Sequence, residues 1–178
     1  MATLFKYPHS VINSYLADYL EFENTLPKMI KVMRNKKEVV YGTIIGEEMV
    51  PEIAGANATA NDYIVFSIQR DDRAHIEYKK HDTISYMIFT KEKGRGIDIK
   101  NSILDALGRR DFSTDDLQDY QLFRSGEEDF HFFDIECNVL GAAEAMNNGK
   151  ESGYYMGTVV IQYSYTYEMD DRGRRLLV

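Results

Sequence analysis

The stretch 157–167, GTVVIQYSYTY, constrains the fold of this chain more than any other. Its odd positions from Val159 to Tyr167 carry large apolar or aromatic side chains, whereas its even positions are mostly Thr, Gln and Ser. Because successive side chains of a strand point to opposite faces, this alternation predicts one buried and one wetter face, which is typical of an antiparallel sheet. A second long strand is predicted at 130–139, and the turn-forming residues 147–153 favour pairing of the two as a hairpin.

Two other stretches repeat their apolar residues at helical spacing. The first is 10–22, where Ser10 is in position to cap the N-terminus. The second carries apolar residues on one side from Ile99 to Leu107 and ends at Gly108. These patterns predict two helices, each with one apolar face to bury.

The remaining segments are shorter. Alternating runs predict strands at 63–69 and 83–90, and the runs 29–33 and 38–45 are each compatible with a strand. We expect a turn at 35–37, a loop at 54–62, an exposed charged connection at 70–82 and a short capped turn at Ser113.

The order of these elements indicates the fold class. There is no repeated strand–helix–strand rhythm and no internal repeat, and 178 residues suit one domain, 1–178. We therefore expect an α+β fold, a single mainly antiparallel β-sheet with two helices packed on one face. The charged residues 168–178 are expected to form an extended C-terminal tail.

Composition narrows the possible partners. The net charge of −8 disfavours a protein that wraps nucleic acid, because affinity for phosphates comes mainly from Lys and Arg. Cys137 is the only cysteine, which excludes an intrachain disulfide and a cysteine-built zinc site. The N-terminus lacks the apolar core of a signal peptide, and no apolar run approaches the length of a membrane span. We expect a protein made in the cytoplasm, with no membrane partner.

The sequence KEKGRG, 91–96, raises the question of a phosphate-binding loop. It does not fit the G-x-x-x-x-G-K-[ST] pattern, because Gly94 and Gly96 are separated by one residue and Ile97 follows. It does not fit G-x-G-x-x-G either, because position 99 is Ile. No cofactor is expected. We interpret the segment 91–96 as a mobile, solvated loop. Alternatively, it is a protruding loop that meets an acidic surface through Lys91, Lys93 and Arg95.

Three groups of residues are candidates for catalysis. His75, Glu77, His81 and Asp82 lie close in sequence but lack the cysteines of a zinc deaminase. Glu77 and Lys79 match the E-x-K of restriction-type nucleases, for which Asp62 is the available third residue.

On the predicted strand 130–139, His131 and Cys137 share a face and lie roughly 20 Å apart, too far for joint chemistry, while Asp134 and Glu136 point the other way. We interpret Cys137 as a small core residue. No motif supports catalysis convincingly, so we expect the chain not to be an enzyme.

The ordered parts together resemble a known family. The first helix, NDYIVFSIQR, DTISYMIF, IKNSILDALGRRD, a long strand and VVIQYSYTY are similar in pattern and order to tail terminator, or tail completion, proteins of long-tailed bacteriophages. The family includes proteins that stabilise the end of a contractile sheath. The resemblance covers about 60–167 and the first helix, and leaves 24–59 and the tail after Tyr167 uncovered.

This resemblance implies a structural virion protein without catalytic residues, assembled in the host cytoplasm. Members form rings, usually hexameric, that cap the tail tube or sheath and join it to the head connector, or head-completion protein. DNA would pass through the channel without specific binding, and an acidic wall would repel its phosphates. The alternatives are a metal-dependent nuclease using Glu77 and Lys79, and an adaptor of another macromolecular assembly.

Two segments are predicted to contact a neighbouring subunit or partner. One is the basic segment with Lys91, Lys93 and Arg95, and the other is the apolar end of the tail, Leu176, Leu177 and Val178. In a ring the tail could bury these three side chains against the next subunit or the tail tube, whereas alone it would fray.

Overall fold

The computed structural model describes residues 5–34, 36–49, 62–71, 79–108, 112–126, 128–140, 144–148 and 151–167. The helices are α1 (Pro8–Phe22), α3 (Lys93–Gly108) and α4 (Thr114–Ser125), with a 3₁₀ turn at Glu47–Met49. The strands are β1 (Met29–Arg34), β2 (Lys37–Gly42), β3 (Ile44–Gly46), β4 (Tyr63–Asp71), β5 (Lys80–Thr90), β6 (Phe130–Leu140), β7 (Glu144–Asn148) and β8 (Glu151–Tyr167).

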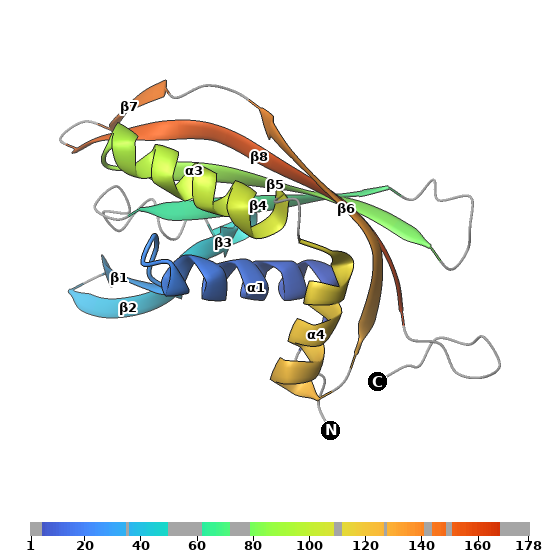
Figure 1. Ribbon diagram of the computed structural model, residues 1–178. Helices are drawn as coiled ribbons and strands as arrows, with labels where there is room; N and C mark the ends of the chain where they lie inside the picture. The colour runs from blue at the N-terminus through green and yellow to red at the C-terminus, as the bar shows by residue number, and fades with distance from the viewer. Residues whose placement is uncertain are drawn as a thin grey trace.

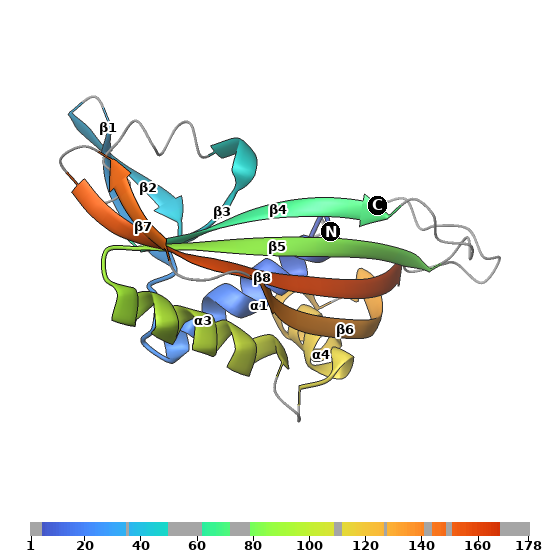
Figure 2. The same cartoon turned by 90° about the horizontal axis from the view of Figure 1, so that it is seen from above.

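The main sheet has the order β3-β4-β5-β8-β6, with β7 also paired to β8. All its pairings are antiparallel except that of β3 with β4. The predicted pairing of the last two long strands is confirmed, but they do not form a simple hairpin. The direct hairpin partner of β8 is β7, which pairs with residues 151–155, whereas β6 pairs further along β8 (Figure 2).

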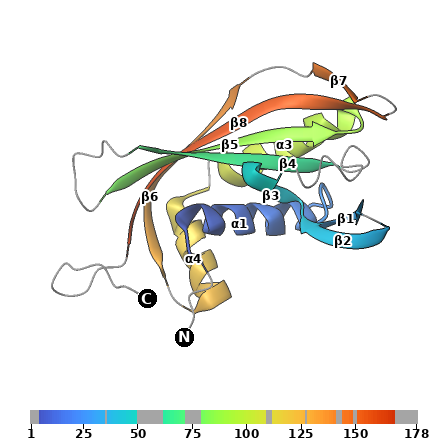
Figure 3. The same ribbon diagram turned by 180° about the vertical axis from the view of Figure 1, so that it is seen from behind.

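The three α-helices of the described residues lie on one face of this sheet (Figures 1 and 3). The side chains between the two layers are fully buried, among them Leu16 of α1, Ile103 of α3, Tyr86 of β5 and Ile161 of β8. The predicted α+β class, with a mainly antiparallel sheet and helices on one face, is thereby confirmed.

A third helix adds to the two predicted. The residues from Ser113 onward form α4 rather than a short turn. The Asp116 carboxylate accepts a hydrogen bond from the backbone N–H of Ser113 at 2.7 Å, as the predicted capping box requires. The helix ends at Gly126, whose φ of 78° is a left-handed conformation that glycine adopts without strain.

A small second sheet adds to the single sheet predicted. Strands β1 and β2 pair as an antiparallel hairpin at one end of α1 (Figure 1). Ile30 and Val32 of its inner face are buried against Ile45 of β3 and partly buried tyrosines. The prediction of strands at 29–33 and 38–45 is therefore confirmed. The second stretch is divided, because β2 ends at Gly42 and β3 follows as a separate strand.

Two helix boundaries differ from the sequence prediction. Helix α1 begins at Pro8 after the extended Tyr7, so Ser10 lies inside it and does not cap it. Proline suits this first position because its missing N–H would have no partner there. Helix α3 begins at Lys93, which makes Gly94 and Gly96 part of its first turn. The prediction of a mobile loop over 91–96 is wrong, since only two residues separate β5 from α3.

Strand β6 contains a bulge that changes which side chains share a face. Phe132 pairs with Tyr165, and Asp134 pairs with the adjacent Ser164, so Phe133 is the extra residue. A one-residue insertion exchanges the two faces of the strand beyond it. His131 and Cys137 therefore lie on opposite faces, and the prediction that they share one is wrong.

Candidate interaction surfaces

The turn between β5 and α3 is organised by Asp62 at the start of β4. One carboxylate oxygen of Asp62 accepts the backbone N–H of Lys91 at 3.0 Å, and the other lies 3.2 Å from Nε of Arg95. The backbone N–H of Gly96 donates to the carbonyl of Glu92 at 3.1 Å. A carboxylate thus already takes the Lys91 N–H and pairs with Arg95, and its negative charge disfavours a phosphate at this turn.

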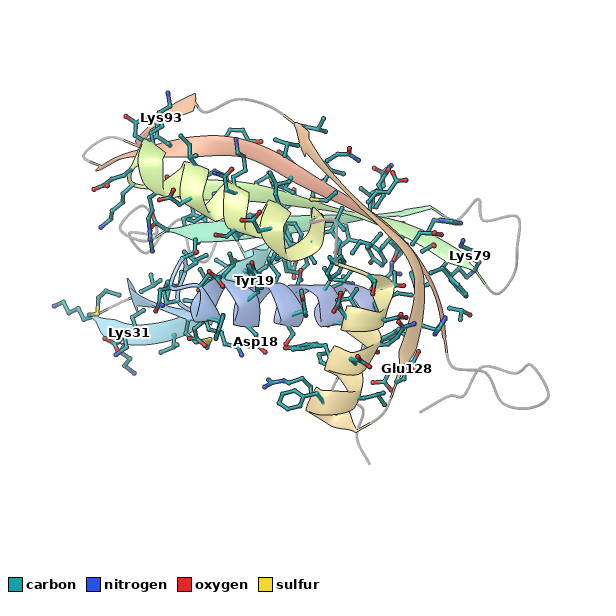
Figure 4. The ribbon with its side chains drawn as sticks, in the orientation of Figure 1. Asp18, Tyr19, Lys31, Lys79, Lys93 and Glu128 are labelled. Carbon is teal, nitrogen blue, oxygen red and sulfur yellow. The ribbon has the colours of Figure 1, made fainter. Side chains whose placement is uncertain are left out.

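The three basic residues predicted as an interface differ in their surroundings. Lys91 and Lys93 are exposed, and Lys93 lies at the start of α3 near the β7–β8 end of the sheet (Figure 4). Arg95 is half-buried and paired with Asp62. Their role in subunit contact stays a prediction, and the other predicted contact residues, Leu176, Leu177 and Val178, lie outside the described residues.

The open face of the sheet carries a polar depression of about 370 Å³ at the end where β5, β8 and β6 meet. Cross-strand pairing places His81 beside Ser164 and Ser164 beside Asp134. The Asp134 carboxylate accepts hydrogen bonds from Lys79 Nζ at 2.8 Å and from Ser164 Oγ at 2.9 Å. Hydrogen bonding to Lys79, and then to Ser164, lowers the pKa of Asp134.

This depression has the residue types of a hydrolase but not the arrangement. The hydroxyl of Ser164 is buried and donates to a carboxylate, whereas an activated serine donates to an imidazole. Asp82 also lines the depression, contrary to the prediction that 70–82 is exposed: it is buried, and its carboxylate accepts the hydroxyls of Tyr163 and Tyr165 at 3.4 and 3.2 Å. These contacts hold the three strands together.

The structure also separates the residues of the nuclease alternative. Asp62 precedes β4 and Lys79 precedes β5, and the antiparallel register of these strands places the two residues at opposite ends of the sheet. With about 3.4 Å per residue, the separation is on the order of 30 Å. Asp62 therefore cannot complete a metal site with Lys79.

The possible metal ligands fall into two sets. His75 and Glu77 lie outside the described residues, whereas His81 and Asp82 are placed in β5. Within the described part of the chain, no three His, Cys, Asp or Glu side chains are grouped to hold a metal ion.

The single cysteine is placed as a packing residue. Cys137 of β6 is half-buried and lies beside Gly108, the last residue of α3. A Cβ added to Gly108 would lie 3.2 Å from the Cβ of Cys137. Burial raises the pKa of its thiol to about 11. Because the thiolate is the reactive form, Cys137 is unsuited to nucleophilic chemistry at neutral pH.

Among the described residues, the outer face of the β1–β2 hairpin is one of the surfaces that expose large apolar side chains. The antiparallel register places Met29, Lys31 and Met33 on this face with Glu38 and Val40 of β2. Met33 is 57% exposed, and Lys31 pairs with Glu38 at 2.9 Å. We call these five residues, with Lys36 at the turn between the two strands, the hairpin surface.

The outer side of α4 is another such surface. Asp115, Asp119, Leu122 and Phe123 fall within an arc of about 100° at 3.6 residues per turn. Phe123 is 83% exposed and Leu122 is 48% exposed. We call these four residues the α4 surface. Isolated exposed leucines are common, but an almost fully exposed phenylalanine beside another apolar residue is a feature of interaction sites.

Asp18 of α1 forms hydrogen bonds with residues next to both surfaces. Its carboxylate accepts hydrogen bonds from the hydroxyl of Tyr120 on α4 and from Nζ of Lys28, which precedes β1. Tyr120 also lies 2.8 Å from the hydroxyl of Ser14, and Arg124 Nη1 lies 4.0 Å from Asp18. The hairpin and α4 are thus fixed to the same helix.

Sequence reasoning missed both surfaces. The hairpin residues were visible as a basic run, but only the fold shows that Met29 and Met33 point away from the core. The capping box at Ser113 is the signal for α4 in the sequence, but by itself it predicts only a short turn.

Comparison with other proteins adds no assignment. The chain matches none of the protein-family profiles and none of the curated protein sequences with which it was compared. Among the described helices, none is long and apolar enough to span a membrane.

Proposed function

We propose that this chain is a structural subunit that assembles into a homo-oligomeric ring, the tail terminator or tail completion ring of a long-tailed bacteriophage. The ring would cap the tail tube or sheath and join it to the head connector. The family resemblance of the sequence motivates this function, and the α+β fold agrees with what that resemblance implies.

The observation that carries the proposal is the pair of exposed apolar surfaces. The hairpin surface and the α4 surface lie at the two ends of α1 (Figure 1). Phe22, which ends α1 near the hairpin, is 80% exposed as well. A chain that exposes large apolar side chains in two separate places is suited to contact a neighbour on each side.

The charge of the chain is compatible with a channel that DNA passes. With a net charge of −8, a ring of several copies would repel phosphates and let DNA move without adhering. The ring would then contact its protein neighbours rather than the genome.

Tail completion in vitro tests this function. Purified full-length protein is added to tails assembled without it by the phage that encodes it, and joining to heads is counted by electron microscopy. We expect the protein to bind at the head-proximal end of the tail and to restore joining. Absence of binding, with tails that native lysate can still complete, would contradict the proposal.

A further inference from the structure

We infer that the hairpin surface of one copy docks on the α4 surface of a second copy. The inference rests on the proposed function in taking a second copy of this chain as the occupant. It goes further by assigning which two surfaces meet.

Charge complementarity is the first argument. Residues 28–38 contain five basic side chains and one acidic, a net charge of +4 in a chain whose total is −8. Residues 113–129 contain six acidic side chains and one basic, a net charge of −5. Only part of this charge lies on the surfaces themselves, where Lys31 and Lys36 stand against Asp115 and Asp119. The remaining charges of the two segments add to local potentials of opposite sign. Such potentials favour encounter of unlike surfaces, and they oppose contact of hairpin with hairpin or of α4 with α4.

Apolar complementarity is the second argument. Met29, Met33 and Val40 form an exposed apolar row along the hairpin, and Leu122 and Phe123 form a compact apolar site on α4. Methionine side chains are flexible and adapt to an inserted aromatic ring. Each surface therefore combines exposed apolar side chains with charged ones, as protein interfaces do.

The position of the two surfaces makes the contact intermolecular. Figure 4 shows Lys31 on the hairpin and Glu128 beside α4 on opposite sides of the molecule, with α1 between them. Both surfaces are tied to α1, the hairpin base through Lys28 and α4 through Tyr120, each bonded to Asp18. One copy therefore cannot close the contact on itself.

Strand β6 is the main competing surface, because no strand in the described residues pairs with its outer edge. Its bulge at Phe133 bends the strand, and Asp134 and Glu136 place charges along it. Bulges and charged side chains are devices that prevent edge-to-edge pairing. These features make β6 a poorer docking surface than the hairpin and α4, although it also exposes Val139 and Leu140.

Paired charge reversals test the inference. One variant carries Lys31→Glu and Lys36→Glu on the hairpin, a second carries Asp115→Lys and Asp119→Lys on α4, and a third combines all four changes. Each of the first two should weaken self-association about tenfold or more in sedimentation equilibrium, and the third should return to within about threefold of the native chain.

Matched controls separate docking from misfolding. Asp98→Lys with Asp105→Lys reverses two exposed carboxylates on α3 and should leave self-association unchanged. Thermal unfolding of every variant should remain cooperative. High salt should weaken association of the native chain and of the combined variant alike, because it screens both sets of charges.

The outcomes distinguish this inference from the proposed function. Rings that survive both single-surface reversals, or a folded combined variant that fails to reassociate, would overturn the pairing and leave the ring function standing. Rescue by the combined variant in an assembly that stops at a dimer would support the pairing and contradict the ring. A native chain that stays monomeric would overturn the pairing.

Discussion

The Asp18 carboxylate fixes α4 and the base of the hairpin to α1, and replacing it with asparagine tests that arrangement. It accepts hydrogen bonds from the Tyr120 hydroxyl and from Lys28, and Arg124 lies within 4.0 Å. Asparagine has nearly the same size and can still accept one hydrogen bond. The Asp18→Asn change therefore removes the charge and leaves the packing in place.

The expected loss of stability follows from these contacts. A hydrogen bond to a charged group contributes roughly 1.5–3 kcal/mol, and about half of the Tyr120 contribution should persist with a neutral acceptor. Lys28 and Asp18 are about one-third exposed, so their ion pair adds no more than about 1 kcal/mol. We expect Asp18→Asn to lower the free energy of unfolding by about 1–2 kcal/mol at neutral pH, which corresponds to roughly 2–8 °C in Tm.

The pH dependence gives this prediction a second measurement. Partial burial alone would raise the pKa of Asp18, but the hydrogen bonds from Lys28 and Tyr120, with the charges of Lys28 and Arg124, outweigh it and lower the pKa. A carboxyl with a lowered pKa in the folded state stabilises fully above its ordinary value near 3.8. That contribution is lost as the pH falls through the lowered pKa.

Urea unfolding of the native chain and of Asp18→Asn across pH 3 to 8 measures both effects. The difference in unfolding free energy should be constant near neutrality and should shrink below about pH 4. Asp105→Asn, on the exposed side of α3, is the control and should change stability by less than about 0.5 kcal/mol. Equal stability of native and Asp18→Asn chains at pH 7 would refute the role given to Asp18.

Three further predictions concern the predicted contact segments and the cysteine. Replacing Lys91, Lys93 and Arg95 with Glu should lower the free energy of unfolding by no more than about 1 kcal/mol, because the charges are exposed or half-buried. The same change should reduce ring formation in sedimentation. An unchanged oligomer size would show that the three residues make no subunit contact. Deleting 169–178 should leave the domain folded by circular dichroism but weaken the ring or its docking to tails, and undiminished assembly would contradict a contact role for the tail. The Cys137 thiol, its pKa raised to about 11 by burial, should react with a disulfide reagent at pH 8 at least tenfold more slowly than in urea; equal rates would contradict its packed position.

Strong alternation made the central part of the fold predictable from sequence. The buried row of β8 from Val159 to Tyr165 was expected from the period of two, and its core partners in β5, such as Tyr86, follow the same pattern. The apolar stripe of α3 was likewise clear. These elements bury apolar side chains against one another, and a regular spacing of apolar residues in the sequence indicates this kind of burial.

Helix α4 was harder to predict because part of its buried side is polar. Gln121 is fully buried, and its amide donates to the carbonyl of Phe130 at 2.8 Å and accepts that residue's N–H at 3.0 Å. Gln118 similarly donates to the carbonyl of Phe132 at 3.3 Å. Hydrophobic periodicity cannot reveal a helix that uses glutamines to bond the backbone of the strand it covers.

The bulge in β6 and the start of α3 depended on contacts between distant segments. Nothing in the local sequence marks Phe133 as the extra residue. The alternation of side chains along a regular strand therefore predicted the wrong faces for the residues after it. Gly94 and Gly96 suggested a loop, but Asp62, about thirty residues earlier, holds the turn beside them. For the same reason, the exposed apolar surfaces could be recognised only after the fold showed what the core leaves uncovered.

The mass of the native assembly tests the ring most directly. The full-length chain, purified without a tag, is measured by native mass spectrometry and sedimentation over a range of concentrations. We predict one closed species larger than a dimer, with about 124 kDa for six copies of 20.6 kDa, and a central hole in negative-stain images. A chain that remains a monomer or a dimer up to about 100 µM, where even weak specific interfaces are occupied, would contradict the account.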